Sequence, residues 1–388
     1  MTSLFYIIIF IVYPSIKQYR SIVVKLLKNN IIMPTTILTI CPELYSTKVA
    51  FSKDENIIYQ SEITHIESDF ILCENIMDQL PLRRDAIMSQ LREDDIDIKS
   101  IQYVVAEGGL LRPCKTGVYV IDKKMVSDLI EGIAGDDVIN LGGLLAYTIA
   151  NNLRIQSFVV DPVSVDERSE LAAFAPHISL KKKSLFHVMI HKYLSKKYAE
   201  SIKKNYEDLN LIFCHVSERS VSVAAHKKGE IVDVNQEFMG CGPMGFFETG
   251  TLPSSDIVDM IFKKCYSKNE ILNLINKGSA NSYLGITSFD KISDAFKDNN
   301  KKVKIFLEAM AYQIAKEIAS HYVSLDGEID AIILSGKIFS LNRFFKYISK
   351  RIKDLAPIVS YPDDFTNEAM IFNVLQLLNG ETQLKNYN

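Results

Sequence analysis

The sequence has no surplus of positive charge. Its 388 residues carry 44 lysines and arginines against 47 aspartates and glutamates, a formal net charge of −3. Surfaces that bind nucleic acid are rich in lysine and arginine. Short lysine runs such as 181–183 and 301–302 sit beside helical patterns, where they are typical of solvated helix faces. We therefore expect no nucleic-acid partner.

Paired cysteines and long apolar runs are also missing. The six cysteines are scattered, with no C-x-x-C motif and no histidine at ligand spacing, which indicates reduced thiols in a cytoplasmic protein. The apolar run at residues 5–13 is too short to span a bilayer, and no lysine or arginine precedes it as in a signal peptide. We expect no membrane span.

The stretch from Asn210 to Pro253 has the strongest local pattern. Apolar and polar residues alternate on both sides of a Lys228-Gly229 turn, which is typical of a β-hairpin. Glycines follow at 240, 242, 245 and 250, and a helical pattern begins after Pro253. Tight turns between a sheet edge and a helix start expose backbone N–H groups, which commonly hold phosphate.

The same stretch resembles the second phosphate-binding hairpin of the acetate and butyrate kinases. The segments AAHKKG, VDVN, GCGP and GTLP match the butyrate-kinase pattern. Residues 217–219, Ser-Glu-Arg, stand in place of a triple glycine, Ser220 reads as a one-residue insertion, and Glu248 occupies the position of an arginine. The resemblance extends from residue 34 to about 380 and implies nucleotide binding at Gly240 and Gly242.

Two further turns resemble nucleotide-binding turns of this family. Residues 41–48 match the N-P-G-S-T-S-T-K turn at four positions but place Glu43 where the family has glycine; a plain β-hairpin turn is the alternative. Residues 335–338, Ser-Gly-Lys-Ile, follow a buried strand and resemble the T-G-G-I turn that approaches the adenosine. The resemblance implies nucleotide contacts at Ser46, Thr47, Lys48, Gly336 and Lys337.

Residues 107–113 resemble the GRGGLLKP motif, whose arginine contacts the acyl carboxylate and the transferring phosphate. Gly108 and Gly109 match, but Glu107 replaces the arginine. The resemblance implies substrate contacts at these three positions and at Glu248. Replacing two guanidinium groups by carboxylates reverses the local charge, at roughly 3 kcal/mol per charge pair at about 5 Å and an effective dielectric of about 20. Residues that could compensate are Arg112, Arg219 and Lys337.

Histidines supply the first catalytic candidates. The segment FHVMIHKYL, within a helix predicted at 183–203, places His187 and His191 on one helical face. It resembles FHGTSHKYV of the acetate kinases, whose histidines line the active cleft; a plain core or interface pair and a metal pair are the alternatives. The resemblance also selects His215, at the end of the central strand.

Carboxylates supply the other catalytic candidates. Asp161 follows a predicted strand at 157–160, and ligands of α/β sheets bind outside the carboxyl ends of strands. Its family counterpart lies near the metal and the reacting phosphate; a structural cap is the alternative. Glu368 matches a cleft-facing family glutamate, although it could instead cap its helix. With Arg219 in the phosphate turn, these residues complete the predicted catalytic set, and Asp161 is also the predicted metal residue.

The predicted fold is α/β, with two duplicated actin-like (ribonuclease H-like) ATPase domains and a nucleotide cleft between them. Three-strand openings recur near 36–62 and 209–235, and 388 residues suit two domains. The resemblance implies an N-terminal domain at 33–163 plus 366–388 and a C-terminal domain at 164–365. We interpret residues 1–32 as an extension upstream of a native start at Met33; a membrane-associating arm is the alternative.

The resemblance implies a butyrate kinase-like phosphotransferase that uses ATP and Mg²⁺ to phosphorylate a short-chain carboxylate, as a homodimer in the cytoplasm. Phosphoryl transfer depends on positioning and charge neutralisation, which the two glutamates oppose. Two alternatives therefore stay open. One is a catalytically impaired paralogue that acts as a binding or regulatory protein; the other is a related enzyme with a different, cationic substrate.

Overall fold

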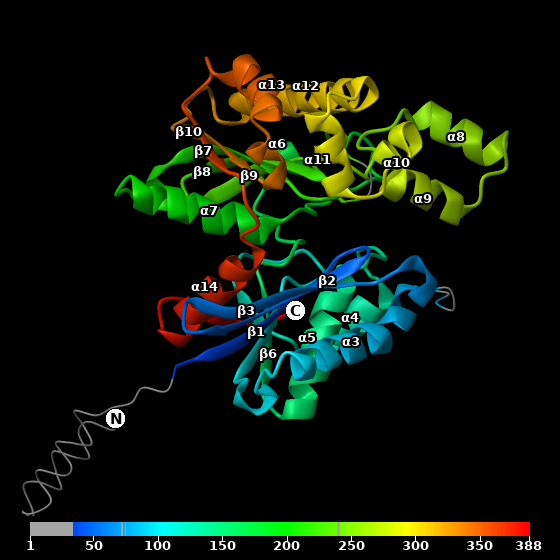
Figure 1. The fold of residues 1–388 in the computed structure, drawn as a ribbon. Coiled ribbons are helices and arrows are strands. Elements are labelled where there is room, and N and C mark those ends of the chain that lie inside the picture. Colours follow the sequence, from blue (N-terminus) through cyan, green and yellow to red (C-terminus); the bar gives the residue numbers. More distant parts are fainter. Residues whose placement is uncertain (1–33, 71–72, 74, 239–240) are drawn as a thin grey trace, which may run out of the picture. The chain divides into compact units, whose positions relative to one another are not determined.

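The computed structural model describes residues 34–70, 73, 75–238 and 241–388. The predicted extension 1–32, the start hypothesis at Met33 and the predicted nucleotide contact at Gly240 lie outside these residues. The chain from Thr36 to Asn388 forms one compact unit, which contains two β-sheets (Figure 1). Among the helices that the structure describes, none is long and apolar enough to cross a membrane.

The first sheet has seven strands in the order β12-β5-β6-β4-β1-β2-β3. β1, β2 and β3 form an antiparallel meander, and β4 and β6 continue the sheet in parallel beside β1. The strands are β1 Thr36–Pro42, β2 Ser46–Lys53, β3 Asn56–Thr64, β4 Tyr103–Ala106, β5 Val118–Val120, β6 Gln156–Val160 and β12 Leu384–Lys385.

The second sheet has five strands in the order β11-β10-β7-β8-β9. β7, β8 and β9 form an antiparallel meander, and β10 and β11 follow in parallel beside β7. The strands are β7 Asn210–Val216, β8 Val221–Lys227, β9 Glu230–Val234, β10 Ala331–Ser335 and β11 Ile358–Tyr361.

The two sheets share one connectivity. Each opens with a three-strand antiparallel meander, and each adds two parallel strands beside the first strand of that meander. The alternating sequence on both sides of Lys228-Gly229 becomes β8 and β9, as the hairpin pattern predicts. The predicted duplicated α/β architecture is confirmed, whereas the predicted domain boundaries stay a prediction.

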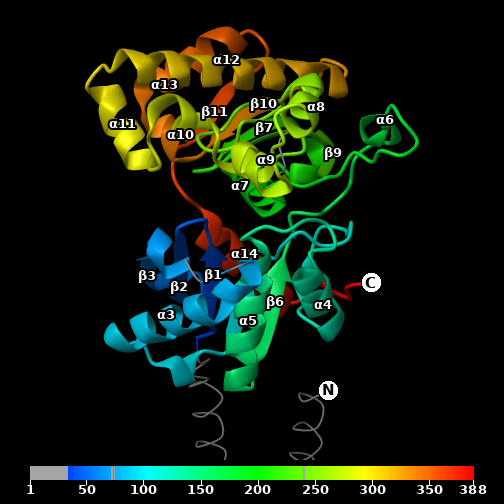
Figure 2. The ribbon, with the colours of Figure 1, turned by 90° about the vertical axis from the view of Figure 1, so that its right-hand side faces the viewer.

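Helices cover both faces of each sheet (Figures 1 and 2). On the first sheet, α3, α4 and α5 lie on one face and α14 on the other; on the second, α12 and α13 lie on one face and α7 on the other. These helices are α3 Gln79–Glu93, α4 Lys123–Glu131, α5 Asn140–Leu153, α7 Val188–Ser201, α12 Lys301–Ser324, α13 Asn342–Ile352 and α14 Thr366–Leu378. The remaining helices are α6 Glu170–Ala173, α8 Ser254–Phe262, α9 Lys268–Lys277, α10 Ser279–Leu284 and α11 Phe289–Lys297.

One apolar core joins the two sheets. It contains Val105 of the first sheet and Phe213 of the second, together with Met189 of α7 and Met370 of α14. Burial of such side chains contributes about 1.5–3 kcal/mol each. Helices α7 and α14 pack on each other between the sheets. The β1–β2 and β7–β8 turns, one from each sheet, line the same pocket.

Helix α7 begins later than the sequence predicts. The predicted helix started at residue 183, but the helix begins at Val188, and His187 is its N-cap with φ −74° and ψ 65°. The residues before it form neither helix nor strand: Phe186 donates its N–H to Val163, and Leu185 accepts from Glu237. The periodicity did not reveal this start, since the segment is held by partners that are distant in sequence.

Candidate functional site

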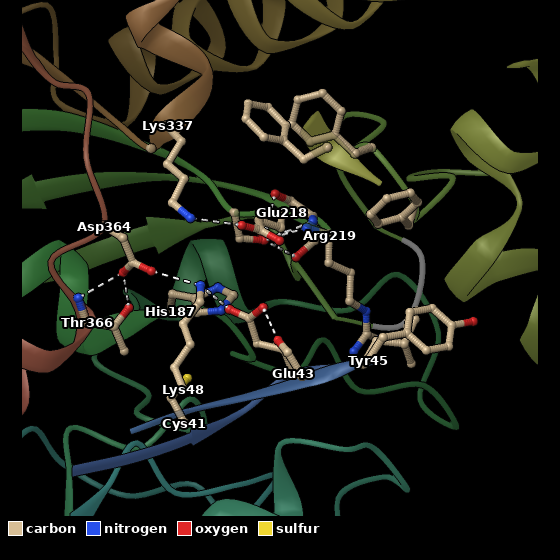
Figure 3. A pocket seen from close by; sticks show the side chains of 18 of the residues that line it. Cys41, Glu43, Tyr45, Lys48, His187, Glu218, Arg219, Lys337, Asp364 and Thr366 are labelled. Atoms are coloured by element: carbon tan, nitrogen blue, oxygen red, sulfur yellow. Dashed lines mark hydrogen bonds and ion pairs between the residues drawn. The ribbon is translucent and has the colours of Figure 1, made fainter. Parts of the chain in front are cut away.

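A pocket of about 380 Å³ lies between the two sheets (Figure 3). Its volume is in the range of small-ligand sites. The first sheet contributes residues 41–46 and Lys48 around the β1–β2 turn, Glu107 after β4, and 137–139 before α5. The second contributes His187, residues 215–220 of the β7–β8 turn, 336–338 after β10, and Asp363, Asp364 and Thr366 around the start of α14. Turns that follow strands therefore form much of the wall.

The β1–β2 turn is built around an ion pair. Lys48 places its Nζ 2.5 Å from Glu43 Oε1 and 2.9 Å from Asp364 Oδ2. Ser46 donates to the other oxygen of Glu43 at 3.3 Å. Burial lowers the pKa of Lys48, but the two carboxylates outweigh it and raise that pKa. Lys48 is therefore a cation that already has two carboxylate partners.

Thr47 does not line the pocket, although the sequence predicts a nucleotide contact there. Its hydroxyl is fully buried, accepts a hydrogen bond from Arg83 Nη1 at 2.9 Å, and lies 2.9 Å from His65 Nε2. Side chains alternate along a strand, so Ser46 and Lys48 face the pocket while Thr47 faces the opposite side. The other two predicted contacts in this turn do line the pocket.

Arg219 in the β7–β8 turn is the centre of a buried three-residue ion cluster. Its Nη1 and Nη2 bind both oxygens of Asp137 at 3.0 and 2.7 Å, and its Nε lies 2.7 Å from Glu248 Oε1. Asp137 is held in place because its Oδ1 also accepts the N–H of Ile139 at 3.1 Å, at the start of α5. A bidentate carboxylate is a strong partner for arginine, so the guanidinium that lines the pocket is engaged on two sides.

Glu248 is 2% exposed and does not line the pocket. Burial raises the pKa of Glu248 to about 7, and Asp137 and Glu237 add to the increase while Arg219 opposes it. Its predicted substrate contact is not supported by this position. We expected Glu248 to reverse the charge that faces the substrate. Its carboxylate instead pairs with Arg219.

Glu107 lines the pocket, as the sequence predicts, and is 3% exposed. Its Oε1 has no hydrogen-bond partner among the described residues, and its Oε2 lies 3.9 Å from Cys41 Sγ. Burial raises its pKa. Gly108 and Gly109 do not line the pocket: an added Cβ would lie 2.5 Å from Val159 and 2.6 Å from Leu129, respectively, so both glycines allow close packing.

The turn after β10 places a glycine against the second sheet. Gly336 has φ 122°, and an added Cβ would lie 2.1 Å from the carbonyl oxygen of Val216. Lys337 extends its Nζ to Glu218 Oε1 at 3.1 Å, and these side chains are 41% and 35% exposed (Figure 3). Both predicted nucleotide contacts line the pocket. Arg112, the other possible compensating cation, lies elsewhere and binds Asp128.

The predicted histidine pair separates. His187 lines the pocket, and its ring centroid lies 5.2 Å from that of His215, which also lines it. His191 is fully buried, with its ring nitrogens 3.0 Å from Ser222 and 3.3 Å from His226. The core alternative therefore applies to His191, while His187 and His215 are brought together as predicted.

The two pocket histidines have opposite charge preferences. Burial lowers the pKa of His187, but Glu237 and Glu107 outweigh burial and raise it to about 9. Burial and the nearby His187 lower the pKa of His215 to about 4, and its Nδ1 lies 3.2 Å from Ser335 Oγ. At neutral pH one ring is a cation and the other is neutral. Such divergence between neighbouring groups is typical of acid–base and charge-stabilising sites.

Three other predicted site residues lie outside the pocket lining. Asp161 is 1% exposed with φ 38°; its Oδ1 accepts the N–H of Gly117 at 2.7 Å, and its Oδ2 has no partner among the described residues. Glu368 is in the first turn of α14, and burial raises its pKa. Gly242 donates its N–H to Thr251 at 2.9 Å within a turn. None of the three is brought to the pocket.

The pocket is rich in carboxylates. Its described lining holds eight, at Glu43, Glu62, Glu107, Asp137, Glu218, Asp290, Asp363 and Asp364. The three lysines and arginines of that lining, at 48, 219 and 337, each contact a carboxylate. Within the described residues, no group of three His, Cys, Asp or Glu side chains is placed as a metal site.

The sequence did not reveal three of the site residues. Asp364 follows strand β11 closely, so the strand-end argument that selected Asp161 could have selected it. Asp137 precedes α5 and Glu237 follows β9, and neither has a local sequence signal. Their roles depend on Arg219 and His187, which come from other parts of the chain.

Known proteins resemble this chain in both sequence and fold. The sequence pattern of the acetokinase family matches residues 177–343. The chain is 36% identical to butyrate kinase 2 of Clostridium acetobutylicum over 356 residues, which are 92% of this chain and 100% of that protein. It is 35% identical to butyrate kinase 1 of the same organism, covering 90% of this chain and 99% of the relative.

Solved structures of low sequence identity share the fold. The acetate kinase of Porphyromonas gingivalis superimposes with a TM-score of 0.69 at 14% identity, covering 89% of this chain and 100% of that one. A propionate kinase from Francisella tularensis superimposes with a TM-score of 0.67, also at 14% identity, covering 88% of this chain and 98% of that one. The predicted fold class is therefore confirmed.

Proposed function

The chain belongs to the acetokinase family, and from that membership we propose that it transfers the γ-phosphoryl group of ATP to a short-chain carboxylate such as butyrate. The observation that carries the proposal is 36% identity across the full length of a butyrate kinase. In the reaction, a carboxylate oxygen forms a bond to the γ-phosphorus while the bond to the β,γ-bridging oxygen breaks. The electron pair of that bond leaves with ADP, and the product is an acyl phosphate.

The pocket has features that suit a nucleotide. It lies between two sheets of matching connectivity, and Gly336 packs directly against the backbone of Val216, which brings the turn after β10 close to the β7–β8 turn. A divalent ion such as Mg²⁺ would neutralise phosphate charge, and it usually needs only one or two protein carboxylates. We propose Glu218 and Asp364, two carboxylates of the pocket lining that now pair with lysines, as the residues that would hold it. We assign no step to Asp161, because it lies outside the lining.

We assign the stabilisation of phosphate charge to those side chains whose N–H groups can leave a present partner, or are still free, to bind a phosphate oxygen. Lys337 and Glu218 are both more than a third exposed, and ion pairs at such positions are worth about 0–1 kcal/mol. Lys337 can therefore exchange Glu218 for a phosphate oxygen at small cost. Arg219 cannot do so easily, since it would leave two buried carboxylates unpaired. His187 and His215 face the pocket as further donors.

A second candidate function is nucleotide binding without turnover, in a regulatory or partner-binding protein. The observation that favours it is that the three Lys and Arg side chains of the described lining already contact carboxylates. Phosphoryl transfer needs cations at the developing charge. The two candidates differ in one respect that can be measured, the appearance of acyl phosphate.

The test combines calorimetry with trapping. We expect MgATP to bind, and butyrate with MgATP to yield an acyl phosphate that hydroxylamine converts to a hydroxamate. The variant His187→Gln should lower the yield at least tenfold, whereas the exposed His177→Gln should leave it unchanged. Binding without hydroxamate for butyrate, isobutyrate and acetate would select the second candidate. No binding at millimolar MgATP would refute both.

A further inference from the structure

Glu237 is a buried carboxylate whose contacts converge on one pocket histidine. It is 2% exposed and lies just beyond β9. Its Oε2 lies 2.8 Å from His187 Nδ1 and also accepts the backbone N–H of His187 at 3.0 Å. Its Oε1 accepts the hydroxyl of Ser220 at 2.8 Å. Both oxygens are thus occupied, and the carboxylate cannot turn away from the ring.

This contact decides which nitrogen of His187 is free. Because Nδ1 faces the carboxylate, Nδ1 carries a proton, and the bond made by one ring nitrogen fixes the state of the other. The His187 side chain is 16% exposed and lines the pocket, and the described residues give its Nε2 no hydrogen-bond partner. The ring therefore has one nitrogen in an ion-pair contact with Glu237, outside good hydrogen-bond geometry, and one available to a ligand.

We propose that Glu237 is a positioning residue that keeps His187 doubly protonated and presents its Nε2–H to the phosphoryl oxygens of the bound nucleotide. The inference rests on the proposed function for the identity of the ligand. Lys48 and Arg219 direct their donors to carboxylates. His187 instead keeps a second donor on the far side of its ring, so carboxylate pairing maintains its charge without using all of its hydrogen-bonding capacity.

The charged and titratable groups around the ring favour the cation. Glu237 comes from the segment after β9 and Glu107 from the end of β4, and both raise the pKa of His187. Arg219 of the β7–β8 turn lowers it, and burial lowers it more. His215 of β7 and His191 of α7 are further titratable neighbours, and burial lowers the pKa of both, that of His215 to about 4, so His215 is neutral at pH 7.

The turn before β8 takes part in this arrangement. Ser220 reads as an inserted residue in the sequence, and its hydroxyl binds the Glu237 oxygen that His187 does not use. It is 1% exposed, so water cannot easily replace this bond. Ser220 also lies beside Arg219, which links the phosphate turn to the histidine through one carboxylate.

Histidine titration tests the positioning role without any need for turnover. With ¹³C-labelled histidine, NMR should show one of the seven rings titrating near pH 9, and its signal should disappear in His187→Gln. In Glu237→Gln, which keeps the shape and an acceptor oxygen, this titration should move down by roughly 1–3 pH units, the range of an opposite charge at contact distance. The exposed Glu230→Gln is the matched control and should leave it unchanged.

Wild-type protein alone can overturn the inference, should Glu237→Gln fail to fold. If the His187 ring of the wild type titrates at or below pH 6.5, Glu237 does not hold it as a cation. An unchanged titration in a folded Glu237→Gln protein has the same meaning.

Enzyme kinetics test whether His187 acts on the phosphate groups of ATP. If acyl phosphate forms, the alkaline limb of kcat/KM for ATP should move to lower pH in Glu237→Gln by the shift seen in NMR. A limb that stays in place would refute the role toward phosphate. If no acyl phosphate forms but His187 titrates near pH 9, the proposed function fails while the positioning role stands.

Discussion

Replacing Glu248 by glutamine should make the protein more stable at alkaline pH. Burial raises the pKa of Glu248 from 4.5 to about 7, so the folded protein binds this proton more tightly than the unfolded chain does. The stability that this proton contributes is fully present below pH 4.5 and is lost as the pH rises through 7. A shift of about 2.5 units corresponds to roughly 3 kcal/mol. Glutamine cannot ionise, so it avoids this loss while it keeps an oxygen beside Arg219.

The assay is urea unfolding of wild type and Glu248→Gln between pH 5 and pH 8. The free energy of unfolding of the variant, minus that of the wild type, should rise by about 2–3 kcal/mol across this range. Glu230→Gln is the control, because Glu230 is exposed and has no such contact, and its difference should stay flat. A difference for Glu248→Gln that stays constant or falls with pH would contradict the raised pKa of Glu248, since it would mean that Arg219 keeps Glu248 ionised throughout.

Three further variants test the pocket. Lys337→Ala should raise KM for ATP about tenfold, equivalent to ~1.4 kcal/mol. Its stability in urea should change little, because its ion pair is exposed. The control Lys346→Ala, on the surface of α13, should change neither KM nor stability. Arg219→Met should lower the free energy of unfolding by roughly 3–5 kcal/mol, because two buried carboxylates lose their partner, and a loss below 1 kcal/mol in urea would contradict the cluster. Gly336→Ala should abolish nucleotide binding or folding, because its Cβ would collide with a carbonyl oxygen. Gly380→Ala, also at positive φ but with open space around the Cβ, should cost only about 1–2 kcal/mol by thermal unfolding.

Local sequence pattern was sufficient for the antiparallel strands of both sheets, whereas the two-domain fold was expected from the family resemblance. The alternation around Lys228-Gly229 gives β8 and β9, and the repeated three-strand openings become the two meanders. These features depend on neighbours in the chain, so periodicity and turn residues report them. The same holds for Gly336, whose turn follows directly from a buried strand.

The electrostatics of the site could not be predicted in the same way. Counting charges at Glu107 and Glu248 suggested two carboxylates facing the substrate, but only Glu107 lines the pocket. Glu248 turns to Arg219, and Arg219 also binds Asp137, 82 residues earlier in the chain. Pairings at this separation are set by the packing of the two sheets, which no local pattern encodes.

The histidines show most clearly what the sequence could not predict. Helical spacing placed His187 and His191 on one face, but the helix begins at Val188 and the two rings lie in different environments. The carboxylate of Glu237, which sets the charge of His187, follows a strand that lies 43 residues further along. A sequence therefore identifies the ring but not its protonation.

We propose that this carboxylate-rich pocket still carries out phosphoryl transfer to a carboxylate. The most direct measurement is ³¹P NMR of the protein mixed with MgATP and butyrate. We predict that the γ-phosphate signal of ATP decreases while an acyl phosphate signal and ADP grow in equal amounts, more slowly in His187→Gln. A spectrum in which ATP persists, or in which ADP appears only with inorganic phosphate, would contradict the claim.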